Sequence, residues 1–337
     1  RTDRAELPEG KKLGNVLWHY EIPEAEKPRS VFADEIRKTA TKILEKKGNH
    51  TLTLALLADS HYTVNGTWED TAYTVEAVHR QAWFDAIVHL GDLTDGMVPQ
   101  KVTESYVKKV LSDLRRNKVP VYTVLGNHDS NYFGENKEPF TNQQQYKLYY
   151  GEISDGRYFD LESGCYCKDY ESLKLRLLFL TSFDYQEPIR YGFSDAVLVW
   201  LRKCLEETPA DFKVIVFSHV PPLPQIHYWS KSIRNGEEVV GLLEKYQANS
   251  RKCSIMAYVH GHNHADQIYR EKLFPIISIG CSKLEYFTDK KPDGAQTPER
   301  KPGMVSQELW DTMVIDPQKN RIDFIRFGAG EDRLIIG

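Results

Sequence analysis

Five short apolar segments of this chain end abruptly in Gly, Asp, Asn or His, and this pattern constrains the fold more than any other feature. The segments are TLTLALLADSH (51–61), FDAIVHLGDLTD (84–95), VPVYTVLGNHD (119–129), FKVIVFSHV (212–220) and SIMAYVHGHNH (254–264). A short, nearly continuous apolar run is typical of a strand that is buried on both faces. Helical patterns lie between the segments, at 70–83, 103–117, 194–208 and 236–249. The alternation predicts a layered α/β fold whose sheets are covered by helices.

The remaining segments predict one domain with an extension in front of it. Residues 1–30 show no periodicity, whereas 30–49 predict a capped amphipathic helix that stops near Gly48. We therefore assign 1–50 to an N-terminal extension and lead-in helix, and 51–337 to one domain with loop insertions. Strand patterns occupy 157–183 and the region after 264, where 316–320 reads as a hairpin turn.

Composition and charge exclude several classes of partner. A formal net charge of -4 gives no basic field for a nucleic-acid backbone. The longest apolar stretches are strand-sized, so we expect a soluble chain without a membrane span. Five cysteines are too few and too scattered for a disulfide framework. The chain begins at Arg1 without a signal-peptide pattern, and nothing in it predicts a compartment or a protein partner.

Metal-ligand residue types occupy all five strand ends. They are Asp59, His61, Asp92, Asn127, His219, His262 and His264. Each alone could be a turn or a helix cap, but a sheet gathers the carboxyl ends of its parallel strands at one edge, so we expect these side chains to converge. One tetrahedral zinc takes about four ligands, so this set predicts two metal ions that share a carboxylate. A shell of oxygen and nitrogen ligands favours manganese, iron or zinc.

The last segment contains three histidines in five positions, His260, His262 and His264. This cluster could be a single-metal site, one share of a two-metal site, or a polar turn. The number of ligand types at the other strand ends favours the second reading. Gly261 would let the chain turn before the metals are reached, which favours an outer-shell or packing role for His260 over direct ligation.

The ordered blocks D-x-H (59–61), G-D-x-x-D (91–95), G-N-H-D (126–129), the strand-end His219 and G-H-x-H (261–264) resemble the calcineurin-like metallophosphoesterase superfamily. The segment FIRFGAGEDR (324–333) is one that we associate with bacterial-type members. The resemblance implies a four-layer α/β/β/α sandwich of two mixed sheets flanked by helices. It also implies a dinuclear metal site at the strand carboxyl ends.

The resemblance further implies a role for each site residue. One metal would be held by Asp59, His61, Asp92 and His264, and the second by Asp92, Asn127, His219 and His262. The cofactors would be two divalent or trivalent ions of manganese, iron or zinc, with a bridging hydroxide as nucleophile. His128 would be the general acid, and Asp95 would orient its imidazole.

The implied function is hydrolysis of phosphate esters, with diesters favoured over monoesters. The alternatives are a catalytically silent scaffold that binds metal, and a two-metal amidase or peptidase. Substrate choice is expected to reside in aromatic-rich loops at 62–70, 130–151, 221–238 and 281–287.

Overall fold

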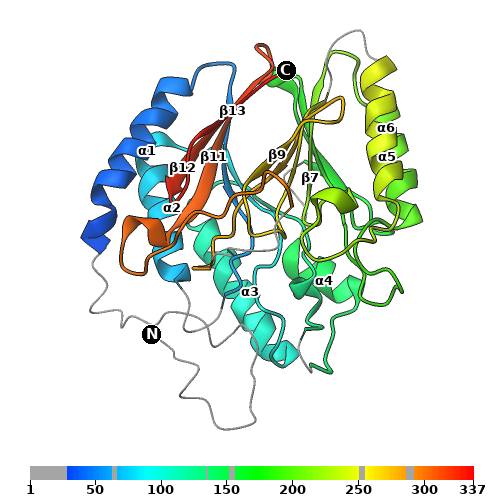
Figure 1. Cartoon of the computed structure of the whole chain (residues 1–337), viewed down its shortest axis with the longest axis horizontal. Coiled ribbons are helices and arrows are strands. Elements are labelled where there is room, and N and C mark those ends of the chain that lie inside the picture. The colour runs from blue at the N-terminus through cyan, green and yellow to red at the C-terminus, as the bar shows by residue number, and fades with distance from the viewer. Residues whose placement is uncertain (1–28, 63–66, 134–135, 152–155, 250–254, 286–291) are drawn as a thin grey trace.

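The computed structural model describes residues 29–62, 67–133, 136–151, 156–249, 255–285 and 292–337. These residues form two mixed β-sheets that face each other (Figure 1). The first sheet has the order β13 (Arg333–Ile336), β12 (Arg321–Gly328), β11 (Leu309–Asp316), β1 (Leu52–Leu57), β2 (Ala86–His89), β3 (Val121–Thr123). The second has the order β4 (Arg157–Phe159), β5 (Tyr166–Tyr170), β6 (Leu175–Phe179), β7 (Lys213–Ser218), β8 (Ile255–His260), β10 (Ile276–Ser278), β9 (Gln267–Tyr269).

Each sheet has a parallel part that carries the five motif segments. Strands β1, β2 and β3 are parallel in the first sheet, and β6, β7, β8 and β10 are parallel in the second. Antiparallel strands extend both sheets at their edges, and the hairpin β11–β12 turns at 317–320 as expected. The predicted pair of mixed sheets is therefore confirmed.

Helices cover the outer faces of both sheets, which completes the four layers (Figure 1). On the first sheet lie α1 (Ala33–Lys46) and α2 (Trp68–Ala82), and on the second lie α5 (Asp195–Glu206) and α6 (Gly236–Asn249). The helix α3 (Gln100–Arg115) precedes β3. Short 3₁₀ turns occupy Arg29–Phe32, His128–Ser130, Glu171–Leu173, Pro224–Ile226 and Val305–Gln307. All five predicted helices, including the lead-in helix, are present.

One described helix was not predicted, α4 (Asn142–Tyr149). Its start carries a capping box, in which the Thr141 hydroxyl accepts from Gln144 N at 3.2 Å and Gln144 Oε1 accepts from Thr141 N at 2.8 Å. The T-x-x-Q spacing was a readable helix-start signal. From the sequence we instead expect residues 130–151 to form a substrate loop.

Strand β7 shows how one strand serves two cores. Val214 and Val216 pack under the helices α5 and α6, whereas Ile215 and Phe217 face the first sheet. Alternation with a period of two fixes this division, because successive side chains point to opposite faces of the sheet. The N-terminal helix α1 also belongs to the core, since Ile36 is buried among residues of the first sheet. The boundary at residue 50 stays a prediction.

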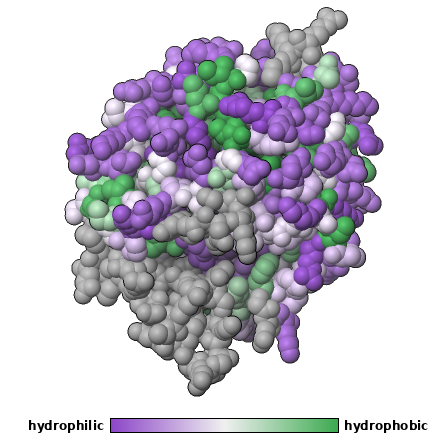
Figure 2. Space-filling model, in the orientation of Figure 1, coloured by the Kyte–Doolittle hydropathy of each residue, from purple (hydrophilic) through white to green (hydrophobic). Residues whose placement is uncertain are grey.

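The described helices are all too short or too polar to cross a membrane. On the face shown in Figure 2, hydrophilic residues surround small apolar areas.

A buried ion-pair network joins the two sheets behind the strand ends. Arg326 on β12 donates to both oxygens of Asp266 at 2.9 and 2.8 Å and to Asp311 Oδ1 at 2.9 Å. Arg333 on β13 pairs with the same two carboxylates. Arg326 is only 2% exposed. This network gives a physical role to the FIRFGAGEDR segment, because Asp266 lies two residues after His264.

Replacing Arg326 with methionine should lower the free energy of unfolding by about 3–5 kcal/mol, because it leaves buried carboxylates without their main cation. Denaturant unfolding followed by circular dichroism measures the loss. Arg321→Met is the matched control on the same strand, since the Arg321–Asp323 pair is partly exposed at 33% and 12% and should be worth about 1 kcal/mol or less. If both variants lose the same free energy of unfolding, the buried network stabilises the fold no more than an exposed ion pair does.

Candidate metal centre

The seven predicted ligand residues converge beyond the carboxyl ends of five strands, and they come from two sheets rather than one. In the first sheet Asp59 and His61 follow β1, Asp92 follows β2 and Asn127 follows β3. In the second, His219 follows β7, and His262 and His264 follow β8. All are buried except His264, which is partly exposed. The ligand side chains therefore meet between two facing sheets, and not at the edge of a single sheet as the sequence predicts.

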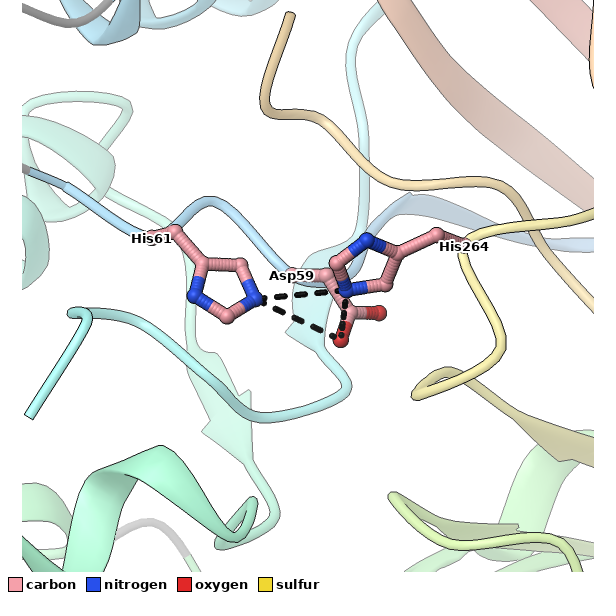
Figure 3. Close-up of side chains that lie close together, drawn as sticks. All are labelled: Asp59, His61 and His264. Carbon is pink, nitrogen blue, oxygen red and sulfur yellow. Dashed lines mark hydrogen bonds and ion pairs between the residues drawn. The ribbon is translucent and has the colours of Figure 1, made fainter. Parts of the chain in front are cut away.

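Asp59, His61 and His264 form one group, in which the ligand atoms all lie within 4.8 Å of one another. Figure 3 shows both imidazole rings and the carboxylate pointing toward one another. His61 Nε2 is 3.3 Å from His264 Nε2 and 4.0 Å from Asp59 Oδ1. His264 Nε2 is 3.3 Å from the same carboxylate oxygen.

Asp92, His219 and His262 form a second group of the same size. His219 Nε2 lies 3.3 Å from Asp92 Oδ2, 3.1 Å from His262 Nδ1 and 2.9 Å from Asn127 Oδ1. Asp92 Oδ2 also lies 3.6 Å from His61 Nε2 in the first group. Asp92 therefore stands between the two groups, where a shared carboxylate has to be.

Hydrogen bonds behind the first group show that its residues fit a cation. His61 Nδ1 donates to Asp95 Oδ1 at 3.0 Å, and His264 Nδ1 donates to Glu285 Oε1 at 3.2 Å. With Nδ1 engaged in this way, the Nε2 atoms of the two rings face each other. Asp59 Oδ1 is buried beside them, and although burial lowers the pKa of the His264 imidazole, Cys281 and Asp59 raise it well above its usual value. This group of atoms therefore attracts positive charge, which a metal cation would supply in place of the His264 proton.

The backbone at the ligands is unusual. Five ligand residues have φ in the left-handed region: Asp59 (53°), His61 (43°), Asp92 (53°), His262 (66°) and His264 (51°). Residues with a Cβ avoid this region at a cost of roughly 1–2 kcal/mol each. Such outliers cluster where a site requires particular side-chain directions.

Two motif glycines provide space at the ligands. A Cβ on Gly261 would lie 2.7 Å from Asp59 Oδ2, and a Cβ on Gly126 would overlap Asp92 Oδ1. Gly261 itself lies outside the left-handed region, so the turn that we attributed to it is made by His262 and His264. Its role is to let the second sheet approach the Asp59 carboxylate.

His260 contributes to neither group of the described residues. It is buried, and its Nδ1 donates to the carbonyl oxygen of Gly261 at 2.9 Å. Burial lowers the pKa of its imidazole to about 4, so the ring is neutral at pH 7. This placement agrees with a packing role.

His128 stands beside both groups. Its ligand atom lies within 4.8 Å of those of His61 and Asp92. Its Nδ1 donates to the main-chain oxygen of Asp95 at 2.6 Å, and its ring stacks on Phe133 with centroids 3.8 Å apart. Asp95 thus contacts His128 through its carbonyl group, while its carboxylate contacts His61.

Charge at the centre is balanced between carboxylates and imidazoles. Burial alone would raise the pKa of Asp92, but His219 and His128 hold that pKa well below its usual value. Burial lowers the pKa of His219, but Asp92, Asp59 and the Leu90 carbonyl together raise it to about 9. His219 is therefore protonated at pH 7 and balances part of the carboxylate charge.

Three polar residues near the ligands were not predicted. Asp129 accepts from the backbone N–H groups of Asp92 and Leu93 at 2.7 and 2.9 Å and so fixes the Asp92 turn. Lys283 and Glu285 follow β10, which is parallel to β8. Both residues follow a buried strand, as the predicted ligands do. The CSKLE stretch contains no histidine or aspartate, however, so it does not resemble a metal-ligand motif.

Aromatic residues of the loops expected to select the substrate differ in how they are placed. Tyr62 is buried against Tyr106, whereas Tyr132 stacks on Tyr185 with the guanidinium of Arg190 4.6 Å from its ring centroid. The Trp229 indole donates to the carbonyl oxygen of His262 at 3.2 Å. Tyr286, in the expected loop at 281–287, lies outside the described residues.

Metal removal should destabilise the chain, because the cations compensate buried carboxylates. Returning Mn²⁺ to chelator-treated protein at 100 times its dissociation constant should add about 2.7 kcal/mol of stability. The thermal unfolding midpoint with and without Mn²⁺ measures this gain.

Asp92→Asn should lose most of the gain, since Asp92 faces both groups, whereas Asp34→Asn on the exposed face of α1 should keep it. An equal Mn²⁺ response in Asp92→Asn and the parent protein would contradict the shared-carboxylate role.

Similarity to known proteins agrees with this geometry. The chain is 21% identical over 226 residues to the manganese-dependent ADP-ribose/CDP-alcohol diphosphatase of Arabidopsis thaliana, a match that covers 56% of this chain and 68% of the relative. A dimetal phosphatase from Danio rerio has the same fold, with a TM-score of 0.63, 16% identity, and coverage of 85% of this chain and 98% of that one. GAP50, the anchor in the inner membrane complex of Plasmodium, also shares it, with a TM-score of 0.54, 14% identity, and coverage of 85% and 89%.

The sequence model of the calcineurin-like phosphoesterase family matches residues 52–266, the segment that carries all five motif blocks. With two buried groups of histidine and aspartate ligands at the matched strand ends, the chain belongs to the calcineurin-like phosphoesterase family and is a metal-dependent phosphoesterase.

Proposed function

We propose that this phosphoesterase hydrolyses phosphate diesters, including substituted diphosphates, in preference to monoesters. The observation that carries the proposal is the position of Asp92 between two ligand groups. Two cations held there would clamp the phosphate and lower the pKa of the attacking water. The first would be bound by Asp59, His61, Asp92 and His264, and the second by Asp92, Asn127, His219 and His262.

His128 is the proposed general acid. Because its Nδ1 donates to the Asp95 carbonyl, Nε2 is the atom available to the oxygen of the leaving group. Burial lowers the pKa of its imidazole to about 4, so the ring is neutral at pH 7 before substrate binds. An anionic phosphate beside Nε2 would favour the protonated ring, which takes its proton from solvent and could then pass it to the leaving-group oxygen. Stacking on Phe133 supports the ring in this position.

The substrate class and the metal are supported by the Arabidopsis relative. It is named a manganese-dependent diphosphatase of ADP-ribose and CDP-alcohols. In such compounds each phosphorus of the cleaved linkage carries two substituents, which is also the chemistry of a diester. We therefore propose manganese as the first metal to test, with iron and zinc as alternatives. The bacterial association of the segment 324–333 stays a prediction.

A catalytically silent scaffold is the second candidate, because the Plasmodium anchor shares the fold. The placement of His128 beside both ligand groups favours an enzyme, since a scaffold needs no acid there. An amidase or peptidase would instead cleave amide bonds and leave phosphate esters intact.

His128→Ala should retain metal and lose hydrolysis. General acid catalysis contributes about 10²–10⁴-fold, so a diester with an alkyl leaving group should lose that much turnover. A nitrophenyl diester should lose less, because its leaving group needs little protonation. Metal content by elemental analysis and initial rates on both diesters measure the effect.

His50→Ala, which replaces an exposed histidine before β1, is the control and should behave like the parent protein. Loss of metal in His128→Ala would make His128 a ligand rather than an acid. Unchanged rates on both diesters would remove the acid role.

A further inference from the structure

The turn after β10 brings a buried lysine to the first ligand group. Ser282 N donates to the carbonyl oxygen of Ala58 at 2.8 Å, and Lys283 N donates to that of Asp59 at 3.2 Å. The Cys281 thiol donates to the carbonyl oxygen of Lys283 at 3.4 Å. The turn is thus fastened to the same loop that presents Asp59. The Lys283 side chain is only 1% exposed.

Lys283 faces two carboxylates, and each of them supports one histidine ligand. Its Nζ lies 2.8 Å from Glu285 Oε2 and 4.0 Å from Asp95 Oδ1. Glu285 accepts from His264 Nδ1 at 3.2 Å, and Asp95 accepts from His61 Nδ1 at 3.0 Å. A continuous chain of polar contacts therefore runs from one histidine to the other, with the lysine at its centre.

Such outer contacts control how well a histidine binds a metal. A carboxylate on the outer ring N–H fixes the tautomer and the ring direction and makes the inner nitrogen more basic. Burying a lysine is costly unless carboxylates compensate its charge, and Glu285 and Asp95 provide that compensation here.

The second ligand group is supported differently. His219 Nδ1 donates to a neutral carbonyl oxygen, that of Leu90, at 2.7 Å. His262 points Nδ1 toward His219, and its Nε2 has no hydrogen-bond partner among the described residues. The two halves of the centre therefore differ in the charge behind their histidines.

We infer that Lys283 is a positioning residue that holds Asp95 and Glu285 against His61 and His264, and so strengthens metal binding in that half of the centre alone. The inference rests on the metal assignment of the proposed function. It does not depend on which ester is hydrolysed.

The direction in which Lys283→Met changes the metal affinity distinguishes a positioning role from a purely electrostatic one. A lysine near a cation repels it, so if Lys283 acted only as a charge, Lys283→Met would tighten metal binding. If Lys283 positions the carboxylates, the same change weakens binding. Loss of an outer contact of this kind typically costs 10–100-fold in metal affinity.

The test is a titration of metal-free protein with Mn²⁺, in which free Mn²⁺ is followed by electron paramagnetic resonance. Lys283→Met should weaken one of the two binding steps about 10–100-fold and leave the other unchanged. Glu285→Gln, which keeps the side-chain shape, should weaken the same step. Circular dichroism verifies that both variants are folded.

Lys301→Met and Glu299→Gln form the matched control, since this exposed pair lies 3.5 Å apart with side chains 61% and 64% exposed. Both should leave both steps unchanged. Tighter binding in Lys283→Met, or equal weakening of both steps, would overturn the inference. If the parent protein binds two Mn²⁺ ions yet hydrolyses no phosphate ester, the proposed function fails while the inference stands.

Discussion

The burial of two carboxylates at the meeting point of two sheets is the constraint on which the rest of this structure depends. One oxygen of each carboxylate accepts a backbone hydrogen bond. Asp59 accepts from His262 N at 3.0 Å, and Asp92 accepts from His128 N at 2.8 Å. The other oxygen of each carboxylate faces imidazole nitrogens. An ionised carboxylate is costly to bury without such partners. The same contacts also join the sheets, because Asp59 belongs to the first and His262 to the second.

Much of this arrangement could be predicted from the sequence, because hydrophobic runs and their polar ends are local features. The five predicted strands are present. The seven predicted ligand residues that follow them are confirmed as neighbours in space. That the strands divide between two sheets was implied by the family resemblance and not by the runs themselves. A run of apolar residues indicates that a strand is buried, but it does not indicate which strand lies beside it.

Other features depend on distances across the fold and leave little trace in the sequence. The side chain of Asp95 was expected to orient His128, but the structure places its carboxylate on His61 and its carbonyl on His128. The sequence predicts that Gly261 lets the chain turn, whereas in the structure its missing side chain makes room for the Asp59 carboxylate. Lys283 follows a strand of only three residues, β10, which pairs with β8. In each case the partner comes from a segment that is remote in sequence.

The pairing of β1 with β11 has a consequence for how the chain acquires its structure. Leu52 lies opposite Ile315 in this ladder, so β1 gains one of its two neighbours only after more than 250 further residues have been made. Arg326 and Arg333, which fix Asp266 just after the last histidine ligand, are synthesised later still. Contacts between residues so distant in sequence close slowly, because the entropy of a long loop must be lost first. During synthesis, therefore, the motif segments leave the ribosome well before the strands that hold them, and an open edge of β1 is the surface that a nascent chain has to protect.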